Sequence, residues 1–192
     1  TNGSSAASDV YKRQSADHDL DWHRAIPELR DPVVIAAFEG WNDAGDAATT
    51  AARHLIERFD ATPLASIDPE RYFDFSTTRP LVHLDEDRRR SITWPSTEVH
   101  AARVPAAGRD VVIVVGLEPQ LQWRRFCRQV LTVADAVNAT SVITLGALLA
   151  DVPHTRPVEI YGATEDPVLM EQLDLSPSTY GGPTGIVGVL TT

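Results

Sequence analysis

The sequence predicts an α/β fold in which a mostly parallel central sheet is flanked by helices and carries a β-hairpin insertion. Two observations support this prediction. Runs that are apolar on both faces, such as PVVIAAF over residues 32–38, alternate with amphipathic segments of helical period. In the middle of the chain, a polar turn, DEDRR, separates two short extended segments. We therefore expect a buried parallel core from which one hairpin departs.

Apolar, β-branched runs mark the strands. The three longest are expected to be buried parallel strands, and they cover residues 32–38, 110–116 and 140–147. Two shorter runs are further strand candidates, at residues 63–67 and 158–163. The hairpin is expected to pair residues 79–84 with 90–95, and residues 97–104 are a candidate third extended segment to join it.

Helices are predicted where apolar residues recur three or four positions apart. The two long helices cover residues 43–59 and 121–138, and Asn138 is expected to end the second in a left-handed conformation. A short helix is predicted over residues 166–173 with Pro167 in its first turn, which is the position that tolerates proline.

Composition limits the class of protein. The chain has 192 residues, 43% of them hydrophobic and 23% charged, which is typical of a globular domain. A net charge of −10 argues against nucleic acid or an anionic membrane as partner, and no apolar run approaches the roughly 20 residues of a membrane span. The single Cys127 excludes an internal disulfide and suits a reducing compartment, so we expect a cytoplasmic protein.

Both ends of the chain are unusual. Residues 1–14 are small and polar, contain Lys12 as the only lysine against sixteen arginines, and resemble a translated sequencing adaptor, so we expect a non-native tail there. Residues 15–30 are expected to be an irregular leader, and residues 31–192 a single domain. Since the last residues, GGPTGIVGVLTT, stop inside a predicted helix, we expect the domain to be incomplete at its C-terminus.

Residues 36–48, AAFEGWNDAGDAA, join the first strand to the first helix. The glycines give this loop the outline of a phosphate-binding loop, but Asp46 follows Gly45 where such a loop needs a Lys and then a Ser or Thr, and three carboxylates would repel a phosphate. Asn42 or Asp43 is predicted to cap the helix, with Asp46 in its first turn, where the helix dipole favours negative charge.

Polar residues follow all three parallel strands. In an open α/β sheet, ligands bind beyond the carboxyl ends of the strands, so these side chains are candidates for one pocket. The candidate pocket residues are Glu39, Asn42, Asp43, Glu118, Asp151, His154 and Arg156. They could perform acid–base chemistry, although an ion-pair network in which Arg156 meets Glu118 or Asp151 explains the same residues. No ligand spacing indicates a metal, and no cofactor is predicted.

Four motifs, in order, are FEGWNDAGDAA, VVGLEP with QWRRF behind it, LGALLADVPHTRP and YGGPTGIVGVL. Together they resemble the proteasome assembly chaperone 2 family, in its actinobacterial branch, over about residues 31–190. The resemblance implies a phosphorylase- or hydrolase-like α/β layout and self-association, with a trimer as one form. Eukaryotic and archaeal members help to assemble proteasome α-rings, whereas many bacterial members have no established activity and some are labelled ligase-like.

Two hypotheses follow from the residues and the resemblance. The first is a non-enzymatic protein-binding module that contacts itself and proteasome α-subunits through apolar surface and hairpin edges. The alternative is a small-molecule enzyme of phosphorylase, hydrolase or ligase type, in which His154 acts as acid or base and Arg156 holds an anionic group. The family's chaperones dock partly through a C-terminal tail with a hydrophobic-Tyr-x ending, whereas this chain ends in Leu190-Thr191-Thr192.

Overall fold

A computed structural model describes residues 19–175 and 180–192, so the predictions for residues 1–14 lie outside the described residues. The chain divides into two compact units. The first unit contains the described residues up to Leu148 together with Gly185–Thr192, and the second is Leu149–Thr184. The assignment of residues 31–192 to one domain stays a prediction.

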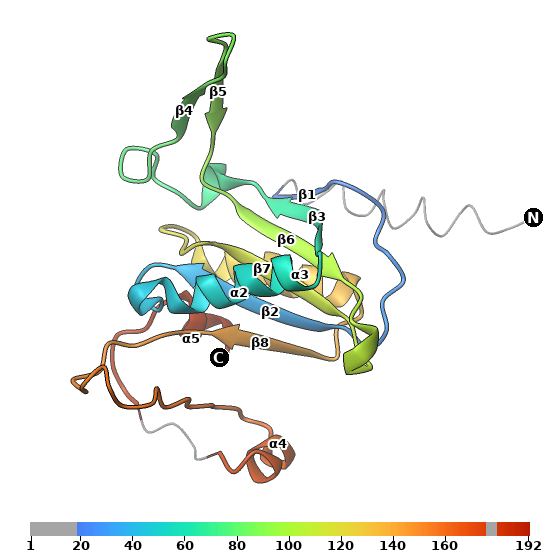
Figure 1. Cartoon of the computed structure of the whole chain (residues 1–192), viewed down its shortest axis with the longest axis vertical. Coiled ribbons are helices and arrows are strands. Elements are labelled where there is room, and N and C mark those ends of the chain that lie inside the picture. The colour runs from blue at the N-terminus through green and yellow to red at the C-terminus, as the bar shows by residue number, and fades with distance from the viewer. Residues whose placement is uncertain (1–18, 176–179) are drawn as a thin grey trace, which may run out of the picture. The chain divides into compact units, whose positions relative to one another are not determined.

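A six-stranded sheet forms the centre of the first unit, in the order β1-β3-β6-β7-β2-β8 (Figure 1). Its parallel core consists of β7 (Val111–Leu117), β2 (Val33–Glu39) and β8 (Ser141–Leu145). Val34 of β2 is paired with Val112 on one side and with Val142 on the other. This parallel core, flanked by helices, confirms the predicted fold class and its three long strands.

The other half of the sheet is antiparallel, and it is formed by β1 (Leu20–Trp22), β3 (Thr62–Ile67) and β6 (Thr97–Ala102). The expectation that residues 97–104 join the hairpin is wrong, because β6 lies between β3 and β7 in the main sheet. Its side chains explain this position, since Val99 and Ala101 are buried in the core. The leader is not wholly irregular either, because β1 adds an edge strand.

Helices cover both faces of the parallel core. One face packs against α2 (Ala47–Arg58), where the contacts are made by small and branched side chains such as Ala48 and Ala52. The opposite face packs against α3 (Trp123–Ala136) and α5 (Ile186–Leu190). There the Phe126 ring meets Phe38 and Tyr72 edge-on, with centroids 5.4 and 5.3 Å apart. This aromatic cluster is the centre of the larger core.

The helix ends differ in detail from the sequence predictions. A 3₁₀ turn, η1 (Ala44–Asp46), precedes α2, and Asp46 has a φ of 56°, so it stands before the α-helix and not in its first turn. α3 starts at Trp123, after a left-handed Gln122, and Asn138 follows it with a φ of 54°, as predicted. Two further 3₁₀ turns are η2 (Pro69–Arg71) and η3 (Pro105–Ala107).

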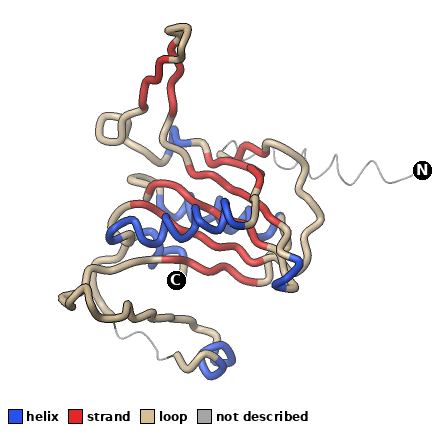
Figure 2. Tube along the Cα trace, viewed as in Figure 1, coloured by secondary structure: helices blue, strands red, loops and turns tan. Residues whose placement is uncertain are grey.

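The hairpin forms as predicted but as a separate two-stranded sheet, from β4 (Leu81–Leu84) and β5 (Arg90–Thr93). Every residue of both strands is exposed. Figure 2 shows this pair extending beyond the six-stranded sheet.

The second unit contains one described helix, α4 (Pro167–Gln172), at the predicted position. Asp166 caps it, since its carboxylate accepts hydrogen bonds from the backbone of Val168 and Leu169 at 2.8 and 3.3 Å. The strand predicted over residues 158–163 is wrong. This segment has no pairing partner among the described residues and is loop in Figure 2, and Val158 and Ile160 are 90% and 95% exposed.

Candidate functional site

The ends of the three parallel strands meet at one rim of the sheet. The Glu118 backbone N–H donates to the Glu39 carbonyl at 2.7 Å, which joins the chain after β7 to the end of β2. Beyond β8, the Ala147 N–H donates to the Asn42 carbonyl at 2.7 Å, and the Ala44 N–H donates back to Ala147 at 3.1 Å. The predicted convergence of strand ends is thus present for the residues in the first unit.

Glu118 lies at the centre of this rim. One carboxylate oxygen accepts a hydrogen bond from the Ile186 N–H at 2.8 Å, at the start of α5. The other lies 3.5 Å from the Trp41 N–H. Gly40 makes room for this side chain, because its φ is 137° and a Cβ there would lie 3.0 Å from the Glu118 Cβ. The carboxylate therefore joins the loop after β2 to the beginning of α5.

Asn42 lies between the same two elements. A Cβ added at Gly185 would lie 1.8 Å from Asn42 Oδ1 and 2.7 Å from Glu118 Oε1, so only glycine fits at this approach. Asn42 Oδ1 is buried and has no hydrogen-bond partner among the described residues. A buried amide oxygen of this kind costs free energy unless a hydrogen-bond donor reaches it.

The two other predicted rim carboxylates serve α2. Asp43 is buried and accepts hydrogen bonds from the Ala48 and Thr49 N–H groups at 2.7 and 3.2 Å, and from the Thr49 hydroxyl. It is the predicted cap, but it acts across the 3₁₀ turn. Glu39 forms an ion pair with Arg53. Glu39 contacts α2 and Glu118 contacts α5, and these helices cover opposite faces of the sheet. The two carboxylates therefore do not form a catalytic pair.

Three of the candidate residues, Asp151, His154 and Arg156, belong to the second unit. All three are exposed. Within that unit, the Arg156 backbone N–H donates to the Pro153 carbonyl at 3.0 Å. The predicted ion pair between Arg156 and Asp151 is not found among the described residues. Because these three residues and Glu118 belong to different units, a pocket that combines them stays a prediction.

The first unit also contains an ionic cluster around a buried carboxylate, which the sequence did not reveal. The Asp19 carboxylate contacts Arg71 at 3.0 Å, forms an ion pair with Arg125, and accepts the Tyr72 hydroxyl at 2.7 Å. Burial raises the pKa of Asp19, but these hydrogen bonds and charges outweigh it and hold the pKa below its ordinary value. Burial, reinforced by Asp19, raises the pKa of Tyr72 far above its ordinary value.

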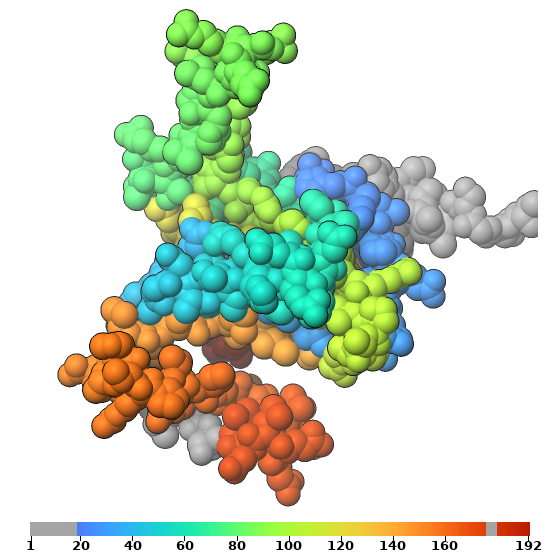
Figure 3. Space-filling view, in the orientation of Figure 1, coloured from blue at the N-terminus to red at the C-terminus, as the bar shows by residue number. Residues whose placement is uncertain are grey.

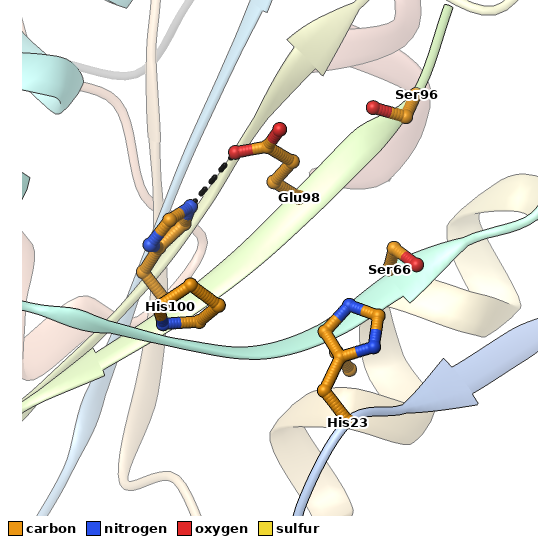
Figure 4. A pocket seen from close by; sticks show the side chains of 7 residues that line it. His23, Ser66, Ser96, Glu98 and His100 are labelled. Atoms are coloured by element: carbon orange, nitrogen blue, oxygen red, sulfur yellow. Dashed lines mark hydrogen bonds and ion pairs between the residues drawn. The ribbon is translucent and has the colours of Figure 1, made fainter. Parts of the chain in front are cut away.

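A cavity of about 280 Å³ opens beside β3 and β6. Figure 4 shows Glu98 and His100 joined across one side of it, with His23, Ser66 and Ser96 also lining the cavity. His100 Nε2 lies 2.9 Å from Glu98, and this hydrogen bond lowers the pKa of the Glu98 carboxyl. The i, i+2 spacing in TEVHAA places both side chains on one face of a strand, which is the signal that could have identified them.

Two features are absent from the part of the chain that the structure describes. No cluster of three or more His, Cys, Asp or Glu side chains in residues 19–175 and 180–192 is arranged to hold a metal ion. No helix in the same ranges is both long and apolar enough to cross a bilayer.

Comparison with known proteins gives consistent results. The model of the PAC2 family matches residues 37–192. A PAC2 family protein from Streptomyces avermitilis is 50% identical over 84% of this chain and 68% of its own, with a TM-score of 0.80. A proteasome-assembly chaperone homologue from Mycobacterium tuberculosis is 46% identical over 82% of this chain and 67% of its own, with a TM-score of 0.75.

A protein of unknown function from Corynebacterium glutamicum is 23% identical, covers 91% of this chain and 66% of its own, and has a TM-score of 0.77, which shows a shared fold. The comparison with curated proteins found no significant match.

Proposed function

The chain belongs to the PAC2 family, and from this premise we propose that it is a cytoplasmic, proteasome-assembly-chaperone-like protein-binding module. In this proposal the protein self-associates, with a trimer as one form, and binds proteasome α-subunits. The family comparison supports the chaperone-like class, because one solved relative is a proteasome-assembly chaperone homologue.

The observation that carries the proposal is how the rim carboxylates are used. Asp43 caps α2, Glu39 is paired with Arg53, and Glu118 holds the start of α5. These groups are occupied in joining elements of the fold, so they are poorly placed to exchange protons with a substrate. Meanwhile, the loops that follow the rim expose apolar side chains, and exposed apolar surface is typical of protein-binding sites.

The second unit supplies most of that surface. Ile160, Tyr161 and Leu173 are more than three-fifths exposed, although Ile and Leu are among the most often buried residue types. A segment with a strand-like composition and no strand partner among the described residues is suited to pairing with the edge of another protein's sheet. We therefore expect residues 158–163 to take part in binding an α-subunit.

Purified α-subunits of an actinobacterial proteasome provide the test. We expect the full chain to bind them, and we expect Ile160→Ser combined with Tyr161→Ser to weaken binding at least about tenfold through lost apolar burial. Thr155→Ser, in the same exposed region, is the matched control and should bind like the parent chain. If the parent chain shows no binding to α-subunits by interferometry or calorimetry, the proposal fails.

One observation favours the enzymatic alternative as a second candidate. Asn42 Oδ1 is buried and lacks a donor among the described residues, and Glu118 is beside it, so a small ligand bearing N–H or O–H groups could satisfy this oxygen. Thermal-shift screening of nucleosides, nucleotides and amides distinguishes the two candidates. A ligand that stabilises the parent chain but not Asn42→Leu would favour an enzyme, and stabilisation by none of the compounds would count against it.

A further inference from the structure

The β4–β5 hairpin has one apolar face. In an antiparallel pair, residues directly opposite each other lie on the same face. Val82 is opposite Ile92, and Leu84 is opposite Arg90, so one face carries three apolar side chains. Val82, Leu84 and Ile92 are 58%, 64% and 54% exposed. This apolar face is therefore not covered by the described part of the chain.

The opposite face is mostly polar. Leu81 is opposite Thr93, and His83 is opposite Ser91, so only one apolar side chain lies there. An isolated two-stranded hairpin is marginally stable in water and ordinarily needs a packing partner. Inside this chain, the Phe75 and Trp94 rings meet 4.9 Å apart at the base of the hairpin. Figure 3 shows the rest of the hairpin standing clear of the sheet.

The tip of the hairpin carries charges of both signs. Asp85, Glu86 and Asp87 are followed directly by Arg88, Arg89 and Arg90, so the tip is neutral although the chain carries a net charge of −10. Asp85 fixes the turn, because its carboxylate accepts the Arg89 N–H at 2.7 Å and its own N–H donates to the Arg89 carbonyl at 3.1 Å. The acidic and basic halves of the tip are thus held side by side.

We propose that hairpins from neighbouring copies of this chain pack together through the face formed by Val82, Leu84 and Ile92. This inference rests on the proposed self-association and names the surface that produces it. The charges favour a second copy as the occupant. A tip with three acidic and three basic residues can match another copy of itself, whereas a partner of a single sign would always meet three like charges.

Self-association measured by sedimentation velocity over a range of concentrations tests this surface. The parent chain should associate. Val82→Thr combined with Ile92→Thr keeps β-branched side chains in the strands but adds hydroxyls to the apolar face, and should raise the dissociation constant at least about tenfold. Leu81→Thr makes the same kind of change on the opposite face and should leave the dissociation constant within about twofold.

A cysteine cross-link gives an independent readout. Cys127 is buried, and burial raises the pKa of its thiol, so it contributes little background reactivity. We expect Ile92→Cys to give a disulfide-linked dimer under mild oxidation, and Leu81→Cys to remain uncrosslinked on a non-reducing gel. Thermal unfolding of each variant shows whether the fold is retained.

The outcomes separate this inference from the proposed function. A parent chain that stays monomeric, or a Thr double variant that associates as tightly as the parent, overturns the inference. If the parent chain is monomeric and the double variant loses α-subunit binding, the face belongs to that partner and the inference is again overturned. A monomeric double variant that still binds α-subunits supports the hairpin contact and leaves the proposed function standing.

Discussion

Two apolar, β-branched segments of this chain have opposite fates. In VVIAAF, residues 33–38, Val34 and Ala36 are completely buried between helices on both faces of the sheet. In VEIY, residues 158–161, every residue is exposed and no strand forms. The two segments have similar strand propensity but different neighbours. β2 has a parallel partner on each side, whereas residues 158–161 have none in the described chain.

This difference shows that an apolar run indicates that a segment becomes buried, but does not indicate which other segment or protein covers it. In the first unit the chain itself provides the neighbours. In the second unit and on the hairpin, the described chain does not cover the apolar side chains, and we propose that other protein molecules cover them. Substitutions in each unit can test this contrast, and the largest effects are expected where burial is most complete.

The largest effect is expected at the aromatic core. Phe126→Ala removes a fully buried ring that contacts Phe38 and Tyr72, and should lower the free energy of unfolding by about 3–5 kcal/mol. Ile160→Ala removes a solvent-exposed side chain of the second unit, and should change the free energy of unfolding by less than about 0.5 kcal/mol. Urea unfolding of both variants measures the two losses of unfolding free energy. Equal losses would show that the two segments do not differ in their contribution to stability.

A smaller effect is expected at Asp19. Asp19→Asn removes the buried carboxylate that pairs with the partly exposed Arg71 and Arg125, and should cost about 2–3 kcal/mol near neutral pH. Asp151→Asn, at an exposed carboxylate of the second unit, is the control and should cost less than about 0.5 kcal/mol.

The pH dependence of Asp19 has a defined sign. Because the folded-state pKa of Asp19 is lowered, its contribution is present above the unfolded pKa of about 3.9 and is lost as pH falls through the folded pKa. The difference in unfolding free energy between the parent chain and Asp19→Asn should therefore narrow below about pH 4. A difference that stays constant down to acidic pH would contradict the ionic role.

The smallest of the three effects is expected at the rim. Gly185→Ala forces a methyl group onto Asn42 Oδ1 and should cost about 1–3 kcal/mol, with faster hydrogen exchange at the α5 amides. Gly181→Ala is the control in the second unit, because a Cβ there would meet nothing within 4 Å. Unchanged α5 protection in Gly185→Ala would show that the rim does not hold α5.

The sequence predicted what depends on local pattern and on the geometry of parallel sheets. Long apolar runs identified β2, β7 and β8, and the rule that parallel strands end at one edge correctly brought Glu39, Asn42 and Glu118 to a common rim. The sequence could not predict which carboxylate contacts which helix. That choice depends on the side of the sheet each residue faces and on the left-handed turn at Asp46, which moved the start of α2.

Features that join distant residues left no local signal. Asp19 meets Arg125 across 106 positions, and nothing in the sequence around either residue indicates the pairing. β6 resembled a third hairpin strand because it follows the hairpin directly, although five of its six residues are buried, as expected for a strand inside the main sheet. The strand predicted at 158–163 failed for the opposite reason, because composition can favour a strand but only a neighbouring strand can complete it.

The close approach at Asn42 also bears on how this fold can change over evolutionary time. The backbone of Asn42 holds Ala147, where the chain leaves the sheet, and its side chain lies against Gly185, where the chain comes back. An excursion whose two ends meet at one residue can be lengthened, shortened or replaced at a small entropic cost of loop closure. Residues 149–184 can therefore change in length or sequence while the six-stranded sheet remains unchanged.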